Sequence, residues 1–102
     1  MRPYDVYEHP VASARWDRLY LVVLSSHLLP DLTQVIVAPL TELKPERLPG
    51  LEVQVTIDDR PFVLVTLDLA SIVARRLKRR VAGLVDYEDD IRRALDRLFT
   101  GF

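Results

Sequence analysis

The stretch Asp86 to Phe102, DYEDDIRRALDRLFTGF, has the pattern of one amphipathic helix with a marked start and a marked end. Asp86 is a favourable N-cap, and Glu88, Asp89 and Asp90 follow where the helix dipole favours acids. Gly101 is the residue type that commonly ends a helix. Apolar residues recur at helical spacing in one stripe, formed by Tyr87, Ile91, Ala94, Leu95, Leu98 and Phe99. We therefore expect a core-facing C-terminal helix, with Phe99 and Phe102 as candidate anchors for a partner.

The chain before this helix has mostly the periodicity of β-strands. Continuous apolar runs at 19–24 (LYLVVL) and 34–38 (QVIVA) predict strands buried on both faces, and Tyr4 to Tyr7 predicts a short strand. Between them, residues rich in proline and polar side chains predict loops at 8–17, 25–31 and 41–50.

A hairpin is predicted in the second half of the chain. Residues 53–57 (VQVTI) alternate apolar and polar side chains, and Asp58-Asp59 predicts a tight turn into a strand over 62–65. The segment 68–84 is ambiguous, because 71–73 fits a strand whereas 74–84 fits a helix. Several short strands followed by one late helix predict a mainly β fold, a small antiparallel barrel with a C-terminal α-helix.

Composition favours a soluble, cytoplasmic, single-domain protein spanning residues 1–102. The chain has 102 residues, 49% of them hydrophobic and 28% charged, with a net charge of −1 and no cysteine. A net charge this close to zero gives no global attraction to nucleic acid or to an anionic membrane. No signal-peptide pattern occurs, and no run approaches the roughly eighteen apolar residues of a membrane span.

Motifs for catalysis or cofactor binding are absent from the sequence. His9 and His27 are the only histidines, and without cysteine they make no metal-ligand spacing. No serine lies in a Gly-x-Ser-x-Gly elbow, and no glycine-rich phosphate loop occurs. We expect no cofactor, no metal and no enzymatic activity, and we see no basic cleft able to perform acid–base chemistry.

The run Arg75 to Arg80 (RRLKRR) is the strongest block of charge. It suits contact with phosphates. The favoured interpretation is a solvated rim that balances the acids at 86–90.

Several segments together resemble the CcdB family, the toxins of plasmid and chromosomal toxin–antitoxin modules. They are Tyr4–Tyr7 (YDVY), Leu21–Leu29 (LVVLSSHLL), Val35–Leu40 (VIVAPL), Leu64–Ser71 (LVTLDLAS), Asp89–Ile91 (DDI), Ala94, Phe99 and Gly101. The resemblance extends over nearly the whole chain, in the family's order of motifs.

The resemblance implies an SH3-like antiparallel barrel with a C-terminal helix that acts as a homodimer. It implies a toxin that binds the DNA gyrase A subunit and traps the cleaved DNA complex. It also implies an antitoxin with a disordered tail, expected to meet the loops 8–13 and 41–50. The pair represses its own operon, so the toxin meets operator DNA only through the antitoxin complex.

The gyrase-binding residues implied by the resemblance lie on the C-terminal helix and its end. They are Ile91, Leu95, Asp96, Phe99, Thr100, Gly101 and Phe102. Thr100 stands where the best-known toxin has tryptophan, and Phe102 is expected to supply an aromatic group in its place. Two alternatives stay open: a ribonuclease like the related MazF-type toxins, and an inactive homologue that only binds antitoxin.

Overall fold

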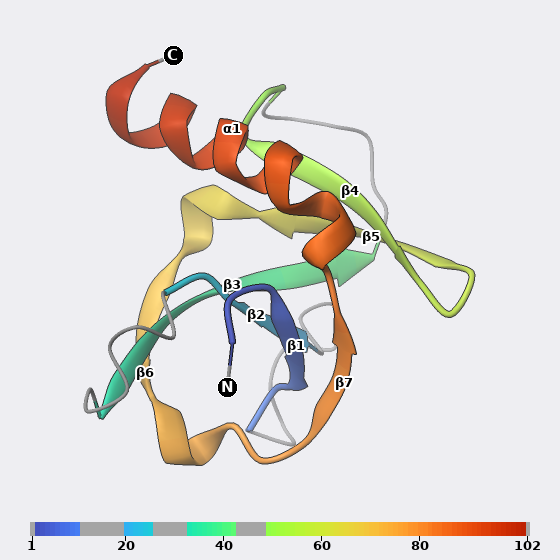
Figure 1. The fold of residues 1–102 in the computed structure, drawn as a ribbon, viewed down its shortest axis with the longest axis vertical. Coiled ribbons are helices and arrows are strands. Elements are labelled where there is room, and N and C mark those ends of the chain that lie inside the picture. Colours follow the sequence, from blue (N-terminus) through green and yellow to red (C-terminus); the bar gives the residue numbers. More distant parts are fainter. Residues whose placement is uncertain (1, 11–19, 26–32, 43–48, 102) are drawn as a thin grey trace.

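A computed structural model describes residues 2–10, 20–25, 33–42 and 49–101 of the chain (Figure 1). The described residues form a curled antiparallel sheet with one α-helix across it, so the predicted barrel with a C-terminal helix is confirmed. The strands are β1 (Asp5–Glu8), β2 (Tyr20–Val23), β3 (Gln34–Glu42), β4 (Glu52–Ile57), β5 (Arg60–Val65), β6 (Ala70–Val73) and β7 (Arg80–Gly83). Short 3₁₀ turns η1 (Thr66–Asp68), η2 (Ala74–Arg76) and η3 (Val85–Tyr87) precede the helix α1 (Glu88–Thr100).

The sheet has the strand order β4-β5-β3-β2-β1-β7, and β6 also pairs with β3. The strand β3 therefore pairs with two strands along one edge. Its residues 34–37 pair with β6, and its residues 40–42 pair with β5. Between these partners lies Pro39, which faces Leu21 of β2 across the other edge. A proline has no N–H to donate, and this position coincides with the gap between β6 and β5. For this reason β3 continues through Pro39 to Glu42, beyond the predicted end at residue 38.

The hairpin of β4 and β5 forms as predicted. Asp58 and Asp59 have φ values of 51° and 64°, the left-handed conformation that both central residues of a type I′ turn require. The pairing of Ile57 with Arg60 closes the turn. Alternate residues of β4 are buried. Val53 and Val55 face inward, whereas Gln54 and Thr56 are exposed to solvent, as the alternation of apolar and polar residues predicts.

The segment 68–84 contains strands and short turns, and the predicted helix over 74–84 is wrong. Residues 70–73 form β6, as one alternative proposed, but residues 74–76 make only the turn η2. Leu77 is buried, and β7 then pairs with β1. An extended chain here can form backbone hydrogen bonds with the edge of β1. This pairing stabilises the strand more than the helical propensity of the arginines stabilises a helix.

The predicted N-cap at Asp86 is also wrong. Asp86 lies inside the turn η3, and the residue at the N-cap of α1 is Tyr87, whose side chain makes no capping hydrogen bond. The other expected end signals are present. Glu88, Asp89 and Asp90 occupy the first turn, and Gly101 ends the helix.

The core consists of two clusters on opposite faces of the central strands. The main cluster fills the space between the sheet and α1 and includes Val6, Val22, Leu40, Leu64, Leu84 and Ile91. The second cluster lies on the other face and contains Tyr7, Leu21, Val23, Val37 and Leu77. The apolar run in β2 is thus buried on both faces, as predicted. The same prediction for 34–38 is wrong in its first half, because Val37 and Ala38 are buried but Ile36 is 38% exposed. Within the described residues, no helix is both long enough and apolar enough to cross a membrane.

Candidate partner-binding surface at the end of the C-terminal helix

The helix α1 is held by β4 near its start and by the turn before β4 near its end. Near its start, the Tyr87 hydroxyl accepts a hydrogen bond of 3.1 Å from the backbone N–H of Thr56. Near its end, the Arg97 guanidinium donates to the Gly50 carbonyl over 3.4 Å. Figure 1 shows the helix crossing above β4 and β5. An edge strand has unpaired backbone groups, so these contacts fix the helix and protect part of that edge.

One face of α1 is buried and the opposite face is ionic. Ile91 and Ala94 are buried in the main core, whereas Leu95 and Leu98 are half-buried. On the outer face, Glu88 pairs with Arg92 at 3.1 Å and Asp90 pairs with Arg93 at 3.2 Å. Pairs at these spacings support a helix by a few tenths of a kcal/mol, about 0.2–0.5 each.

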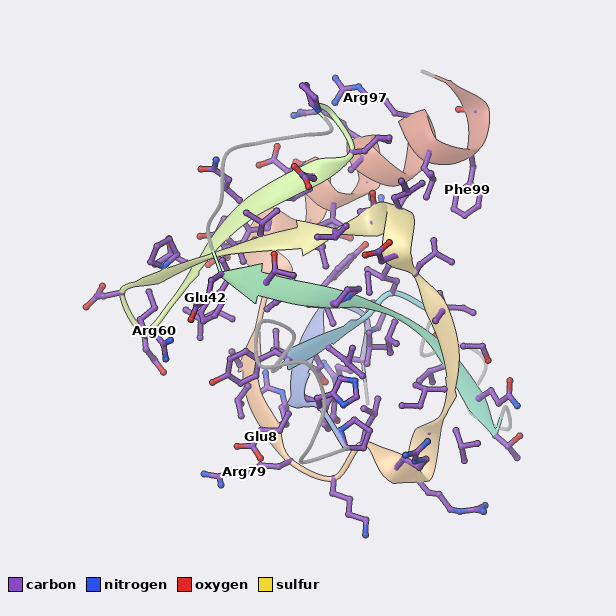
Figure 2. The ribbon with its side chains drawn as sticks, turned by 180° about the vertical axis from the view of Figure 1, so that it is seen from behind. Glu8, Glu42, Arg60, Arg79, Arg97 and Phe99 are labelled. Atoms are coloured by element: carbon purple, nitrogen blue, oxygen red, sulfur yellow. The ribbon has the colours of Figure 1, made fainter. Side chains whose placement is uncertain are left out.

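The last turn of α1 presents an aromatic side chain to solvent. Phe99 is 70% exposed, the largest exposed fraction among the large apolar side chains in the described part of the chain. In Figure 2 its ring extends from the helix on the side away from Arg97. The Thr100 hydroxyl donates to the Asp96 carbonyl at 2.6 Å, and Gly101 takes a left-handed conformation with φ of 81°. Gly101 ends the helix after Thr100, one residue beyond Phe99, and leaves the Phe99 ring in the last turn at the edge of the molecule.

A second exposed apolar side chain lies on the element that α1 contacts at this end. Leu67 of η1 is 50% exposed, and α1 packs against η1. The surface formed by Phe99 and the adjacent turn η1 is called the helix-end surface below. It differs from a scattered apolar residue because two neighbouring elements contribute to it.

The residues predicted for gyrase binding are divided between the surface and the core. Asp96, Phe99, Thr100 and Gly101 are exposed. Leu95 is half-buried, and Ile91 is fully buried, so its side chain supports the helix from beneath. Phe102 lies outside the described residues.

Part of the basic run at 75–80 packs against or pairs with other elements of the fold. Leu77 is buried in the second core cluster, Arg80 Nε donates to Asp5 Oδ1 at 3.0 Å, and Arg79 pairs with Glu8 at 3.6 Å. The acids of α1 pair with Arg92 and Arg93 instead. The cations of the run are exposed, as a solvated rim requires, but its ion pairs are made with Glu8 and Asp5 and not with the acids at 86–90.

A cleft that the sequence did not reveal lies beside this run. It has a volume of about 300 Å³ and is lined by Glu8, His9, Pro10, Arg76, Lys78 and Arg79. Burial, and secondly the charge of Arg76, lower the pKa of His9 below its ordinary value of 6.5. The cleft is basic, contrary to the expectation that no basic cleft exists. Spacing along the sequence gave no signal for it, because residues 8–10 and 76–79 meet only through the pairing of β1 with β7. Among the described residues, no three His, Asp or Glu side chains gather as a metal site.

An antiparallel half-barrel that carries a single C-terminal helix is the fold of the CcdB/MazF-type toxins. The family model described as CcdB protein matches residues 3–101, and the chain belongs to this family. The protein is therefore a toxin of the toxin–antitoxin class.

Solved structures of toxins agree with this assignment. The Mycobacterium tuberculosis toxin MazF-mt6 is 25% identical, with a TM-score of 0.70 over 96% of each chain. A crystal structure of an Mtb toxin is 26% identical, with a TM-score of 0.69 over 80% of this chain and 92% of the other. No curated protein sequence matches the chain.

Proposed function

We propose that this protein is a gyrase-directed toxin that binds the gyrase A subunit through the helix-end surface and traps gyrase on cleaved DNA. Membership of the CcdB family supports this function, because gyrase poisoning is what the resemblance implies. The observation that carries the proposal is Phe99, an aromatic side chain 70% exposed at the end of a helix that is otherwise fixed on the sheet. Exposed aromatic anchors supply much of the energy of protein interfaces.

The contact residues divide by their exposure. Phe99 is the anchor, and Asp96, Thr100 and Gly101 surround it at the surface. Leu95 is half-buried and contributes only its exposed part to the proposed contact. Ile91 is buried and contributes indirectly, by holding the helix in place on the core. Phe102, which lies outside the described residues, is proposed as a second aromatic contact that takes the role of the tryptophan replaced by Thr100.

The remaining partners follow from the same proposal. The toxin acts as a homodimer, and its cognate antitoxin binds it and joins it in repressing the operon. The proposed antitoxin contacts at 8–13 and 41–50 lie partly outside the described residues. Sedimentation velocity of the purified toxin, alone and with an antitoxin peptide, tests both associations.

The decisive experiment incubates plasmid with purified gyrase and the toxin, then denatures the protein and measures the fraction of plasmid that is linear. Added toxin should increase the linear fraction, and Phe99→Ala should require at least about tenfold more protein for the same effect, the scale of an interface hot spot. The matched control is Val85→Ala, which removes an apolar side chain 65% exposed in η3, before the start of the helix. Equal potency of Phe99→Ala and the parent would contradict the assigned surface, and the absence of trapping by the parent would contradict gyrase as the target.

A second candidate is a ribonuclease, which the similarity to the toxin MazF-mt6 over 96% of each chain favours. Incubation of the toxin with purified RNA, without gyrase, distinguishes this activity from the first. RNA cleavage without DNA trapping would replace the proposed function. Neither activity, with antitoxin binding retained, would identify an inactive homologue.

A further inference from the structure

The basic cleft lies at the end of the molecule opposite the helix-end surface. In Figure 2, Glu8 and Arg79 lie together at one end of the long axis, and Phe99 lies near the other. A ligand in this cleft therefore leaves Phe99 accessible. Binding at the helix end makes no use of the cleft. Its residues 8–10 also belong to the proposed antitoxin contact at 8–13, so the ligand chemistry of the cleft must be argued from its own lining.

The cleft is built by pairing between distant parts of the chain. The backbone N–H of Glu8 donates to the Arg79 carbonyl at 3.0 Å and extends the ladder between β1 and β7. Buried Leu77 anchors the segment that carries Arg76 and Lys78. The cations thus extend from a fixed backbone, which lowers the entropy cost of gathering them around one ligand.

The charges in the cleft favour an anion. Among the described residues that line the cleft, Arg76, Lys78 and Arg79 stand against one carboxylate, that of Glu8. The Glu8–Arg79 pair is long, at 3.6 Å, and its side chains are 48% and 76% exposed, so an incoming anion can displace it at little cost. No ion pair joins Arg76 or Lys78 to a carboxylate within the described residues. Guanidinium groups bind phosphates with two parallel hydrogen bonds.

A second, apolar pocket adjoins the cleft and shares His9 with it. This pocket has a volume of about 170 Å³ and is lined by His9, Leu21, Val37, Pro39, Asp68 and Ala70. Leu21, Val37 and Pro39 are buried and form an apolar floor. An imidazole ring beside such a floor offers a planar surface on which a base can stack.

We propose that the two pockets form a binding site for single-stranded nucleic acid, with backbone phosphates at Arg76, Lys78 and Arg79 and a base in the pocket beside His9. A charged groove next to a stacking surface is the combination that single-stranded nucleic acid requires. A peptide of acidic side chains alone would use the cations but would have no planar group for the adjoining pocket. The site is independent of gyrase binding, and its test uses no gyrase.

The test is fluorescence anisotropy of a labelled oligothymidylate titrated with the full-length toxin at several salt concentrations. DNA is chosen because it lacks the 2′-hydroxyl and is no substrate for a ribonuclease. Arg76→Gln should weaken binding about two- to fivefold, the scale of one exposed ion pair, and should reduce the slope of log affinity against log salt by about 0.7. Glu8→Gln should strengthen binding by a similar factor, because it removes the one carboxylate among the described residues that line the basic cleft.

Two further variants make the assignment specific. Arg93→Gln on α1 removes one positive charge away from the cleft and should leave affinity within twofold of the parent (about 0.4 kcal/mol). Ala70→Leu places an extra side chain at the apolar pocket and should weaken oligothymidylate but not inorganic polyphosphate, which has no base. Ala70 is exposed, so this change is compatible with folding, which circular dichroism checks.

Several results would overturn the proposal. They are no binding of oligothymidylate at low salt, equal weakening by Arg76→Gln and Arg93→Gln, or tighter binding of polyglutamate than of oligothymidylate at the same cleft. The last result would assign the cleft to an acidic peptide.

Discussion

At the scale of single residues, Ile91 and Phe99 show how one apolar stripe serves two purposes. Both belong to the same helical pattern, yet Ile91 is fully buried and Phe99 is 70% exposed. The difference arises because the helix extends beyond the sheet at its last turn, where η1 is the element beneath it. Ile91 thus packs the helix onto the core, and Phe99 stays accessible to the proposed partner.

The two residues should respond differently to truncation. Ile91→Ala should lower the free energy of unfolding by about 2–4 kcal/mol, because it removes buried methylene groups and leaves a cavity. Phe99→Ala should change it by less than about 0.5 kcal/mol, because most of its side chain is already in water. Urea denaturation followed by circular dichroism measures both. Similar losses for the two variants would show that Phe99 is a core residue.

At the scale of elements, α1 and β4 depend on each other. The Tyr87 hydroxyl accepts from the Thr56 N–H, a group on the outer edge of β4 that has no strand beside it. We expect Tyr87→Phe to cost about 0.5–1.5 kcal/mol, the usual net value of one hydrogen bond. Hydrogen exchange should become faster at the Thr56 amide, with Ile57 as the internal control. Unchanged exchange at Thr56 would contradict this role for the hydroxyl.

The end of α1 depends on the backbone conformation of Gly101. Its φ of 81° is costly for a residue with a Cβ, although no atom within 4 Å would meet that Cβ. Gly101→Ala should therefore cost about 1 kcal/mol through the backbone alone and should fray the turn that carries Phe99 and Thr100. Thermal unfolding gives the energy, and amide exchange in the last turn shows the fraying. Gly101→Asn is the matched control, since asparagine tolerates this conformation better.

At the scale of the whole molecule, the two proposed binding surfaces differ in chemistry. One end carries Phe99 and η1, and the other carries the cations around His9. A net charge of −1 conceals this separation, because it sums the basic end with the acids elsewhere.

The basic end also makes stability depend on pH. Burial and Arg76 lower the pKa of His9 in the folded protein, so the unfolded chain binds a proton more readily at this residue. Stability contributed by His9 is therefore complete above its ordinary pKa of 6.5 and is lost as the pH falls through that value toward the lower folded pKa. His9→Gln should flatten the pH dependence of the unfolding midpoint between pH 7 and the acid range. An identical pH profile for the variant would contradict the assignment.

Most of the strands and the helix could be predicted from the sequence, because their signals are local. The apolar runs of β2 and β3, the alternation in β4 and the two aspartates of its turn determine those elements over a few residues. The errors lie where long-range contacts decide. Residues 80–83 form β7 and no helix, because they pair with the edge of β1. Pro39 is tolerated within β3 because none of the described strands pairs with β3 on the side of its nitrogen.

The sequence by itself determined the mainly β fold, the C-terminal helix and the stop at Gly101, and its resemblance to the CcdB family is confirmed. Hydrophobic periodicity and turn chemistry act between near neighbours, so they can be read along the chain. Only the tertiary structure decided that Ile91 is buried while Phe99 is exposed, and that His9 joins Arg76 and Arg79 in one cleft. Exposure and the meeting of distant side chains depend on which strands pair, and that pairing is a property of the whole sheet.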